Sequence, residues 1–328
     1  MTITAEQHPE RAAALPRARI GVALGSGSAR GWAHIGVMEA LAAAGVPLDV
    51  VCGSSVGALV GAAYVAGGLT PLKRWALDIS WRDMVRLIDL RVASGGLLEG
   101  DRIVRVFEDM YGVRSIEDLA TPFSAVATEL GTGQEVWLSA GRLATALRAS
   151  MALPGLFSPV SIRGQQLVDG ALVNPVPVSL CRALGADVVI AINLNSDRIG
   201  RRIARRSARR NDRSRTRAEF LDRMSSEMPP GLRAGINWIA NRVLGEAGYS
   251  PAYFDVIVGS INIMQDQITR SRMAEHPPDI VIAPRLHGIG LLEFNRAAEA
   301  IEEGRRAASR ALPQLRKLLE RRSGARES

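Results

Sequence analysis

The first 66 residues repeat one pattern twice: a short apolar run, a glycine-containing turn, and a segment with apolar side chains at helical spacing. The first apolar run is Ile20–Leu24, and its helix is expected over residues 32–44. The second run covers residues 48–52, and the turn 53–57 opens a helix that ends near Ala66. Because a helix is the usual connection between parallel neighbours, this pattern predicts an α/β protein with a parallel sheet.

The later segments fit the same class. A hairpin is expected around Gly131 and Gly133, and the apolar run at 187–194 is typical of a buried parallel strand. A last amphipathic helix is expected over 293–321, with Pro313 as a candidate break. The other expected elements are a helix at 102–111 after Asp101, strands at 123–129, 134–138, 166–168 and 279–283, and helices at 141–152, 175–184 and 254–272.

One abrupt change of composition divides the chain. Residues 197–250 combine an arginine run with a Pro-Pro-Gly break, and the α/β pattern resumes after them. We therefore expect one domain with an insertion. Its parts are an N-terminal tail (1–18), the core (19–196), the Arg-rich insertion and variable segment (197–250), and C-terminal helices with a strand that complete the domain (251–328).

The arginine run also accounts for the net charge. The chain has 41 Lys and Arg against 33 Asp and Glu, a formal charge of +8. Residues 197–217 hold ten arginines and two aspartates, which leaves 31 basic and 31 acidic residues elsewhere. A chain that is neutral outside one segment lacks the globally basic surface that tracks nucleic acid. Its 47% hydrophobic content excludes disorder along the whole chain.

Three features bear on the compartment. Cys52 and Cys181 lie in apolar runs, which indicates buried, reduced thiols rather than a disulfide framework. Polar residues from His8 onward interrupt the N-terminus, where an export signal needs a continuous apolar run. The longest apolar window, 46–69, contains Asp49 and a Gly-Ser-Ser turn and is too broken for a transmembrane helix. The sequence therefore predicts a cytoplasmic protein.

The turn between the second strand and its helix reads Gly53-Ser54-Ser55-Val56-Gly57, which fits G-x-S-x-G. Two glycines permit a strained turn that lifts the middle serine out of the sheet, with its hydroxyl at the N-terminus of a helix. The pentapeptide alone also fits an ordinary strand-to-helix turn, because Gly and Ser are common there. The strand before it and the helix after it favour Ser55 as a nucleophile.

A serine hydroxyl is unreactive without a base that removes its proton. Histidine is the usual base, and the chain has His8 in the tail, His34 on the first helix, and His276 and His287 far downstream. Asp169 is the other candidate, since a strand end followed by Gly170 and Ala171 would present its carboxylate. By itself Asp-Gly is an ordinary turn, so both kinds of base stay open at this point.

A glycine-rich loop follows the first strand, with the sequence Gly25-Ser26-Gly27-Ser28-Ala29-Arg30-Gly31. The backbone N–H groups of such a loop face an anion, which suits either a dinucleotide pyrophosphate or the oxyanion of acyl transfer. In a dinucleotide site, an acidic residue is expected about 20 positions after the glycine-rich loop, near the end of the second strand. Here Asp49 precedes that strand, and the Ser55 turn occupies its end. The oxyanion interpretation is therefore favoured.

In this order, the three elements resemble those of the patatin-like phospholipase family. The loop from Gly25 to Gly31 is similar to the family's glycine-arginine oxyanion loop, and residues 53–57 are similar to its nucleophile elbow. Asp169-Gly170-Ala171 resembles its Asp-Gly-Gly/Ala element. The resemblance is close over residues 19–195, and the four motifs in correct order, counting 149–154, are specific to the family.

Two further stretches support the resemblance, and the glycine-rich loop departs from it at two positions. Residues 174–177 are also expected after the aspartate, and residues 261–284 resemble the bacterial branch related to neuropathy target esterase. The departure is in the loop, where serines stand at positions 26 and 28 in place of the family's successive glycines. Backbone donation survives this exchange, but a serine tolerates positive φ less well than glycine.

The resemblance implies a three-layer α/β/α fold with a mostly parallel central sheet, and hydrolysis of phospholipid or lysophospholipid acyl esters without metal or cofactor. Ser55 is then the nucleophile, Asp169 accepts its proton, and water hydrolyses the acyl-serine. The implied oxyanion donors are the N–H groups of Ser26, Gly27, Ser28 and Val56. A carboxylate with a reference pKa of about 3.9 is a poor base for a hydroxyl, so the dyad requires a partly desolvated pocket.

Two neighbouring residues have open roles. Arg30 either holds the loop or attracts a phosphate head group. His34 is expected to be a packing or hydrogen-bonding residue of the first helix rather than a catalyst.

Two other functions fit parts of the sequence. A conventional α/β-hydrolase would use Ser55 and Asp169 with either His276 or His287, in the chain order Ser, Asp, His. Loss of activity in a folded variant of one of these histidines would favour a conventional α/β-hydrolase.

A binding or regulatory module would instead have an inactive core with the arginine segment as its functional part. Lack of ester turnover and of fluorophosphonate labelling at Ser55 would favour that alternative.

The arginine segment also has two interpretations. Arginine pairs at 201/202, 205/206 and 209/210 recur every four residues and would cover about half of a helix. This favours peripheral contact with an anionic membrane through Arg198 to Arg217. Ten like charges repel one another, so a mobile loop is the structural alternative. The run lacks aromatic residues for base stacking, so specific nucleic-acid binding is not expected. The sequence leaves the oligomeric state open.

Overall fold

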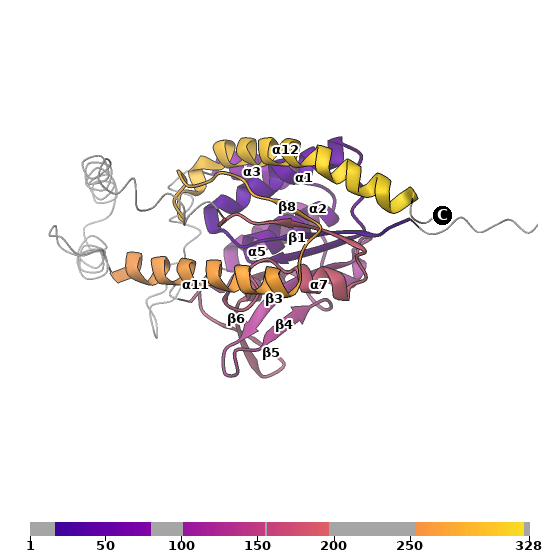
Figure 1. The fold of residues 1–328 in the computed structure, drawn as a ribbon. Helices are drawn as coiled ribbons and strands as arrows, with labels where there is room; N and C mark the ends of the chain where they lie inside the picture. The colour runs from indigo at the N-terminus through magenta and orange to yellow at the C-terminus, as the bar shows by residue number, and fades with distance from the viewer. Residues whose placement is uncertain (1–16, 80–100, 155, 197–252, 325–328) are drawn as a thin grey trace, which may run out of the picture.

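The computed structural model describes residues 17–79, 101–154, 156–196 and 253–324. Most of the N-terminal tail and the whole Arg-rich insertion, including Arg198 to Arg217, therefore lie outside the described residues. The expectations for these segments stay predictions. The other segments form one sheet with helices on both of its faces (Figure 1).

Eight strands form the sheet, in the order β5-β6-β3-β2-β1-β7-β8 with β4 paired to β3. Five strands are mutually parallel: β1 (Ile20–Leu24), β2 (Val50–Ser54), β3 (Phe123–Glu129), β7 (Val188–Ile192) and β8 (Ile280–Ile282). Three pair antiparallel: β4 (Glu135–Leu138), β5 (Val160–Ile162) and β6 (Gln165–Asp169). The prediction of a mostly parallel sheet is confirmed, and the expected hairpin is β3–β4.

The helices form two layers. One face of the sheet is covered by α1 (Ala33–Ala43), α2 (Val56–Val65) and α12 (Ala297–Gly324), and the other by α7 (Val178–Ala183) and α11 (Tyr253–Glu275) (Figure 1). The helices α3 (Thr70–Asp78), α5 (Asp101–Tyr111) and α6 (Leu143–Ser150) pack on the side of α1 and α2. This arrangement confirms the three-layer α/β/α fold.

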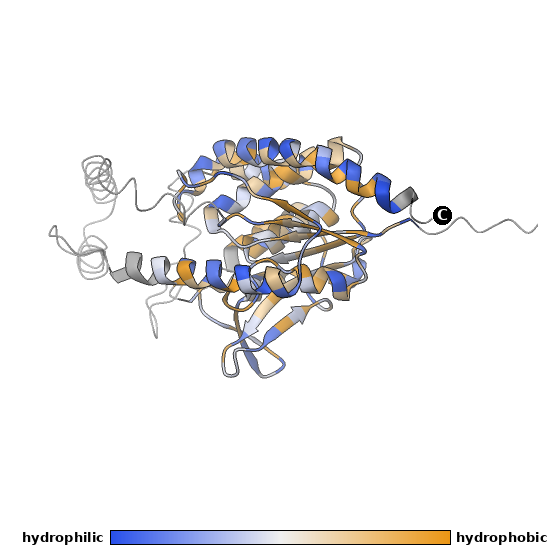
Figure 2. Ribbon diagram, in the orientation of Figure 1, coloured by the Kyte–Doolittle hydropathy of each residue, from blue (hydrophilic) through white to orange (hydrophobic). Residues whose placement is uncertain are grey.

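Alternation along the central strands produces the two core layers. In β1, Val22 and Leu24 belong to the cluster under α1 and α12, whereas Ala23 belongs to the cluster under α7. Every residue of β1, β2 and β7 is buried. A parallel strand that is covered on both faces must be apolar throughout, which is why these runs are nearly continuous in the sequence. Figure 2 shows hydrophobic strands at the centre and hydrophilic outer faces on the helices.

The last helix differs from the expectation. The prediction of a break at Pro313 was wrong, because α12 continues through this residue to Gly324. A proline removes one intrahelical hydrogen bond and usually kinks a helix. Here Leu315 is buried in the core and Leu312 and Leu318 pack against it, so tertiary contacts on both sides of the proline hold the helix in one piece.

Two smaller expectations concern cysteines and membrane spans. Cys52 and Cys181 are free and buried, as predicted, and both belong to the core under α7. Among the helices that the structure describes, none is long and apolar enough to cross a bilayer.

Candidate active site

The turn between β2 and α2 holds Ser55 in a strained backbone conformation. Its φ is 57° and its ψ is −128°, a region that residues other than glycine rarely adopt. The flanking glycines are required by close approach: a Cβ on Gly57 would lie 2.2 Å from the carbonyl oxygen of Leu24, and one on Gly53 would lie 2.4 Å from the nitrogen of Ala58. The G-x-S-x-G turn thus has the geometry of a nucleophile elbow, with the serine at the start of a helix.

The register of β3 brings an aspartate to the end of β2. Because β4 pairs with residues 125–128 along one edge of β3, both β2 and β6 must use the opposite edge. On that edge Ser54 pairs with Val126, and Asp169 pairs with the next residue, Ala127. The antiparallel strand β6 therefore ends where the parallel strand β2 ends, and the residues that leave the two strands face each other.

Ser55 and Asp169 are in direct contact at this point. The Ser55 hydroxyl donates a hydrogen bond to Asp169 Oδ2 at 2.7 Å. The other carboxylate oxygen, Oδ1, accepts the backbone N–H of Ala171 at 2.8 Å. Gly170 makes this turn possible, because a Cβ there would lie 2.2 Å from the carbonyl oxygen of Val126. The two residues that the family resemblance pairs thus form one hydrogen-bonded pair.

Burial makes Asp169 a stronger base than an exposed aspartate. The side chain is 1% exposed, and desolvation raises its pKa from 3.8 to about 6, against the opposing effect of its hydrogen bonds from Ala171 and Ser55. A carboxylate with a pKa near 6 is ionised at neutral pH and still has useful affinity for a proton. The pair can therefore polarise a serine hydroxyl and hold its proton during attack on a carbonyl carbon.

The glycine-rich loop lies beside this pair. Gly27 and Ser28 line the same small pocket as Ser55 and Asp169. Their backbone N–H groups, like that of Val56 at the start of α2, donate to no other group among the described residues. Ser28 has a φ of 49°, so the serine that replaces a glycine does occupy a left-handed conformation. These three N–H groups are available to a developing oxyanion.

Ser26 does not fit its predicted role as a backbone donor. Its N–H group already donates to the carbonyl oxygen of Pro175 at 2.9 Å, which ties the loop to the segment after Asp169. The Ser26 hydroxyl is buried and has no partner within the part of the chain that the structure describes. An N–H group that is occupied in this way cannot also point at the pocket, so the candidate donors are Gly27, Ser28 and Val56.

Arg30 and His34 are buried, and their hydrogen bonds stabilise the glycine-rich loop. Arg30 is buried and donates through Nε to the carbonyl oxygen of Ile289 at 2.8 Å, which supports the structural role over phosphate attraction. His34 Nε2 lies 2.7 Å from the carbonyl oxygen of Gly25 and must carry a proton, since a carbonyl only accepts. Burial lowers the pKa of His34 to about 4, so the ring is neutral. His34 is therefore a hydrogen-bonding helix residue, as expected.

Two supporting residues were not identified from the sequence. The Ser150 hydroxyl accepts the backbone N–H of Ser55 at 2.9 Å and so fixes the elbow. The Thr128 hydroxyl donates to the carbonyl oxygen of Asp169 at 2.8 Å. Ser150 lies in the 149–154 stretch that the resemblance had marked without a role, so a signal existed for it. Nothing in the sequence around Thr128 distinguishes it from other strand residues.

The late histidines lie outside this pocket. His276 follows α11 with its side chain 42% exposed, and His287 is also exposed. The pocket that contains the Ser55–Asp169 pair is lined by neither of them. In a Ser-His-Asp arrangement the imidazole lies between serine and carboxylate. Here the hydroxyl contacts the carboxylate directly.

The pocket itself is small. Its free volume is about 20 Å³, roughly what one water molecule needs. The walls are the loop and the hydrogen-bonded pair on one side and residues of α11 on the other; the full lining is Ser26, Gly27, Ser28, Ser55, Leu153, Asp169, Ile261, Asn262, Gln265 and Leu291.

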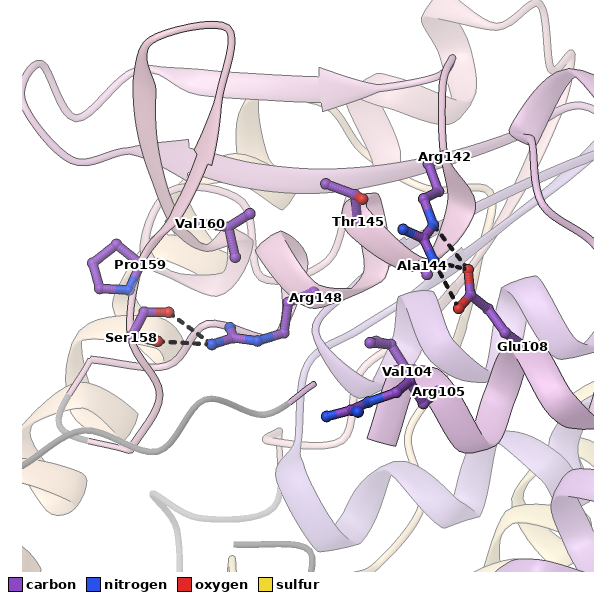
Figure 3. Close-up of a pocket in the computed structure, with 10 residues that line it drawn as sticks. All are labelled: Val104, Arg105, Glu108, Arg142, Ala144, Thr145, Arg148, Ser158, Pro159 and Val160. Atoms are coloured by element: carbon purple, nitrogen blue, oxygen red, sulfur yellow. Dashed lines mark hydrogen bonds and ion pairs between the residues drawn. The ribbon is translucent and has the colours of Figure 1, made fainter. Parts of the chain in front are cut away.

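A larger cavity, of about 480 Å³, lies between α5, α6 and the start of β5 (Figure 3). Figure 3 shows Arg142 paired with Glu108 and Arg148 directed toward Ser158, to which it donates two hydrogen bonds. None of the predicted site residues lines this cavity. Among the described residues, the predicted nucleophile, base and loop residues 26–28 therefore lie at the smaller pocket and not at this cavity.

Comparisons with known proteins agree on a family. The sequence model described as patatin-like phospholipase matches residues 22–182. An uncharacterized NTE family protein of Mycobacterium tuberculosis is 34% identical over 329 residues, which covers 90% of this chain and 91% of that protein.

Longer relatives match a part of the chain. A patatin-like phospholipase domain-containing protein of Caenorhabditis elegans is 36% identical over 186 residues, and a protein named lysophospholipase nte1, of Emericella nidulans, is 34% identical over 184 residues. Each match covers 54% of this chain but only 14% and 12% of those proteins. Among solved structures, VipD from Legionella pneumophila is similar with a TM-score of 0.54 at 14% identity, over 91% of this chain and 67% of that one, which supports the fold alone.

Proposed function

This chain belongs to the patatin-like phospholipase family, in a branch with NTE family proteins, and from that premise we propose that it cleaves phospholipid or lysophospholipid acyl esters with Ser55 and Asp169. As a family member it is a carboxylic ester hydrolase of lipid metabolism. The observation that carries the proposal is the 2.7 Å hydrogen bond between Ser55 Oγ and Asp169 Oδ2.

The proposed acylation step uses both residues. Ser55 Oγ attacks the ester carbonyl carbon while its proton passes to Asp169. The tetrahedral intermediate has its negative oxygen near the N–H groups of Gly27, Ser28 and Val56. Collapse of the intermediate breaks the bond to the leaving alcohol, which takes the proton back from Asp169. The acyl group is then esterified to Ser55, and the carboxylate is again free to accept a proton.

Deacylation repeats the sequence with water. Asp169 accepts a proton from a water molecule that attacks the acyl-serine carbonyl, and the same N–H groups stabilise the second oxyanion. The fatty acid leaves, and Ser55 regains its proton from Asp169. Each preorganised oxyanion donor contributes roughly 3 kcal/mol to the stability of such an intermediate. The raised pKa of Asp169, about 6, brings its basicity closer to what this proton transfer requires.

The arginine segment is proposed to bring the enzyme to its substrate. Residues Arg198 to Arg217 lie outside the described residues, but in the sequence they hold ten arginines within a chain that is otherwise neutral. Each basic residue near an anionic membrane contributes about 1 kcal/mol of attraction. We therefore expect peripheral membrane contact. Deletion of residues 198–217 should weaken co-sedimentation with anionic vesicles; unchanged binding would show that the segment has no such role.

A comparison of substrates tests the proposed specificity. Purified protein is assayed with a lysophospholipid, a diacyl phospholipid and a triacylglycerol, with Ser55→Ala as the inactive control. The proposal expects fatty-acid release from one or both phosphate-containing lipids to exceed release from triacylglycerol. Preference for triacylglycerol, or equal release by the Ser55→Ala variant, would contradict it.

A further inference from the structure

Helix α11 has its polar side turned inward. Asn262, Gln265, Asp266 and Thr269 lie at spacings of three and four, which puts them on one face, and all four are buried to at least 93%. The neighbouring residues Ile263 and Met264 are 55% and 51% exposed. A surface helix of a globular protein normally buries its apolar side. The polarity of this part of α11 is therefore inverted.

The inverted part of α11 covers the site. Ile261, Asn262 and Gln265 form one wall of the pocket that contains Ser55 and Asp169. The helix also packs on the turn Gly170–Leu172, directly after the aspartate. Sites that hold a small organic ligand have volumes of about 300 to 1,000 Å³, whereas this pocket has about 20 Å³. A pocket of this volume does not hold an acyl chain, so part of its lining must move before an acyl ester reaches Ser55.

The C-terminal end of α11 is held to other elements of the fold by Arg272 and Met273. There Arg272 forms an ion pair with Glu135 at 3.2 Å and donates to the carbonyl oxygen of Val173 at 3.2 Å, and Met273 packs against the core under α7.

Nearer the pocket, two buried polar groups bond within the helix itself. Asp266 accepts from Arg270 Nε at 3.0 Å, and the Thr269 hydroxyl donates to the carbonyl oxygen of Gln265 at 2.7 Å. These two groups keep their partners if this part of the helix moves outward.

From these contacts we infer that Ile263 and Met264 dock on a lipid surface, and that their insertion draws α11 away from the pocket so that an acyl ester reaches Ser55. The inference rests on the proposed function, since the surface it names is the one that holds the substrate. Aliphatic side chains on the exposed side of an interfacial helix enter the acyl boundary of a membrane, and the strength of binding scales with the apolar area they bury. Arg270 lies on the same exposed side, two turns along; its side chain is paired with Asp266 and 56% exposed, so anionic head groups of a docked surface would meet it there.

A second copy of the chain is the less suitable occupant. A stable protein interface buries about 800 Å² on each partner. Two half-exposed side chains, with the exposed Gln267 and Arg270 beside them, do not offer an apolar area of that size. The lipid surface is therefore the partner that the exposed pair fits.

The test replaces the exposed pair without adding charge. The double variant Ile263→Gln, Met264→Gln is compared with Leu77→Gln, a matched control because Leu77 is 48% exposed on α3, on the opposite side of the sheet. Hydrolysis is measured with a water-soluble short-chain ester and with a phospholipid in vesicles of phosphatidylcholine and phosphatidylglycerol. We expect vesicle hydrolysis to fall about tenfold or more in the double variant, with the soluble ester and the control variant little affected.

Binding is measured separately from catalysis. The same substitutions are made in Ser55→Ala protein, and co-sedimentation with these vesicles is quantified, so docking is tested even if the proposed hydrolysis is wrong. Loss of vesicle binding in the double variant alone supports the inference. Unchanged vesicle binding and hydrolysis, an equal loss on the soluble ester, or a change of oligomeric state in light scattering would each overturn it.

Discussion

Ser55 and Asp169 are 114 residues apart in the chain, and their side chains meet at 2.7 Å because β2 and β6 end against successive residues of the same edge of β3. One strand runs parallel to β3 and the other antiparallel, so their last residues converge from opposite directions. The contact thus depends on the topology of the sheet rather than on a flexible loop. Geometry of this kind is preorganised, which is what a short-lived oxyanion intermediate requires.

The pH dependence of activity should follow Asp169. The carboxylate must be ionised to accept the serine proton, and burial raises its pKa to about 6. We expect kcat/KM for a neutral soluble ester to be level above this pH and to fall tenfold for each pH unit below it. A pH–rate profile from pH 4.5 to 8.5 measures this. A fall centred well above pH 6, or a level profile down to pH 4.5, would count against Asp169 as the base.

Asp169→Asn should abolish activity and stabilise the fold at alkaline pH. A pKa raised in the folded state means that this group's contribution to stability is fully present below pH 3.8 and is lost as the pH rises through about 6. Asparagine removes the buried charge, so the free energy of unfolding of Asp169→Asn at pH 8 should exceed that of the wild type by on the order of 3 kcal/mol. Denaturant titrations at pH 8 and pH 4 measure this, and the difference should vanish at pH 4.

His276→Ala and His287→Ala should keep kcat/KM within about twofold, because the His276 side chain is 42% exposed, His287 is exposed, and neither lines the pocket. Ester turnover of the purified, folded variants measures this. A loss of several orders of magnitude in either one would identify a Ser-His-Asp triad instead. His34 serves as the contrast, since its hydrogen bond to Gly25 holds the oxyanion loop. His34→Phe should lower kcat with little change in KM.

Gly57→Ala should abolish activity and destabilise the protein by about 3 kcal/mol or more, because its Cβ would lie 2.2 Å from the carbonyl oxygen of Leu24. Gly45→Ala is the matched control. Gly45 has a φ of 71° but nothing within 4 Å of its Cβ position, so alanine there should cost about 1 kcal/mol and leave activity intact. Thermal unfolding and ester turnover distinguish the two. Equal effects would contradict the close packing of the elbow.

Much of this site was predictable because its parts are local. The elbow and the oxyanion loop depend on glycines at fixed offsets between a strand and a helix, and such patterns are visible in the sequence. Asp169 was predictable only in combination with them, since Asp-Gly alone marks an ordinary turn. The family resemblance supplied the pairing of the two residues, which no spacing in the chain indicates.

The features that the sequence did not show depend on long-range contacts. Three of these contacts join segments far apart in the chain. They are the meeting of β2 and β6 at one edge of β3, the hydrogen bond from the Ser55 N–H to the Ser150 hydroxyl, and the hydrogen bond from the Ser26 N–H to the carbonyl oxygen of Pro175. Helix propensity also failed at Pro313, where the buried Leu315 and the partly buried Leu312 and Leu318 pack on the core and keep α12 continuous. The inward polar side of α11 could not be assigned without knowing what it covers.

Covalent labelling tests the central claim most directly. Wild-type protein, Ser55→Ala and Asp169→Asn are treated with a fluorophosphonate, digested and mapped by mass spectrometry, and ester turnover is measured on the same samples. We expect one adduct, on Ser55, in the wild type, none in Ser55→Ala, strongly slowed labelling in Asp169→Asn, and a loss of turnover on the order of 10⁶-fold in Ser55→Ala. An adduct on another residue, or wild-type turnover in Ser55→Ala, would contradict it.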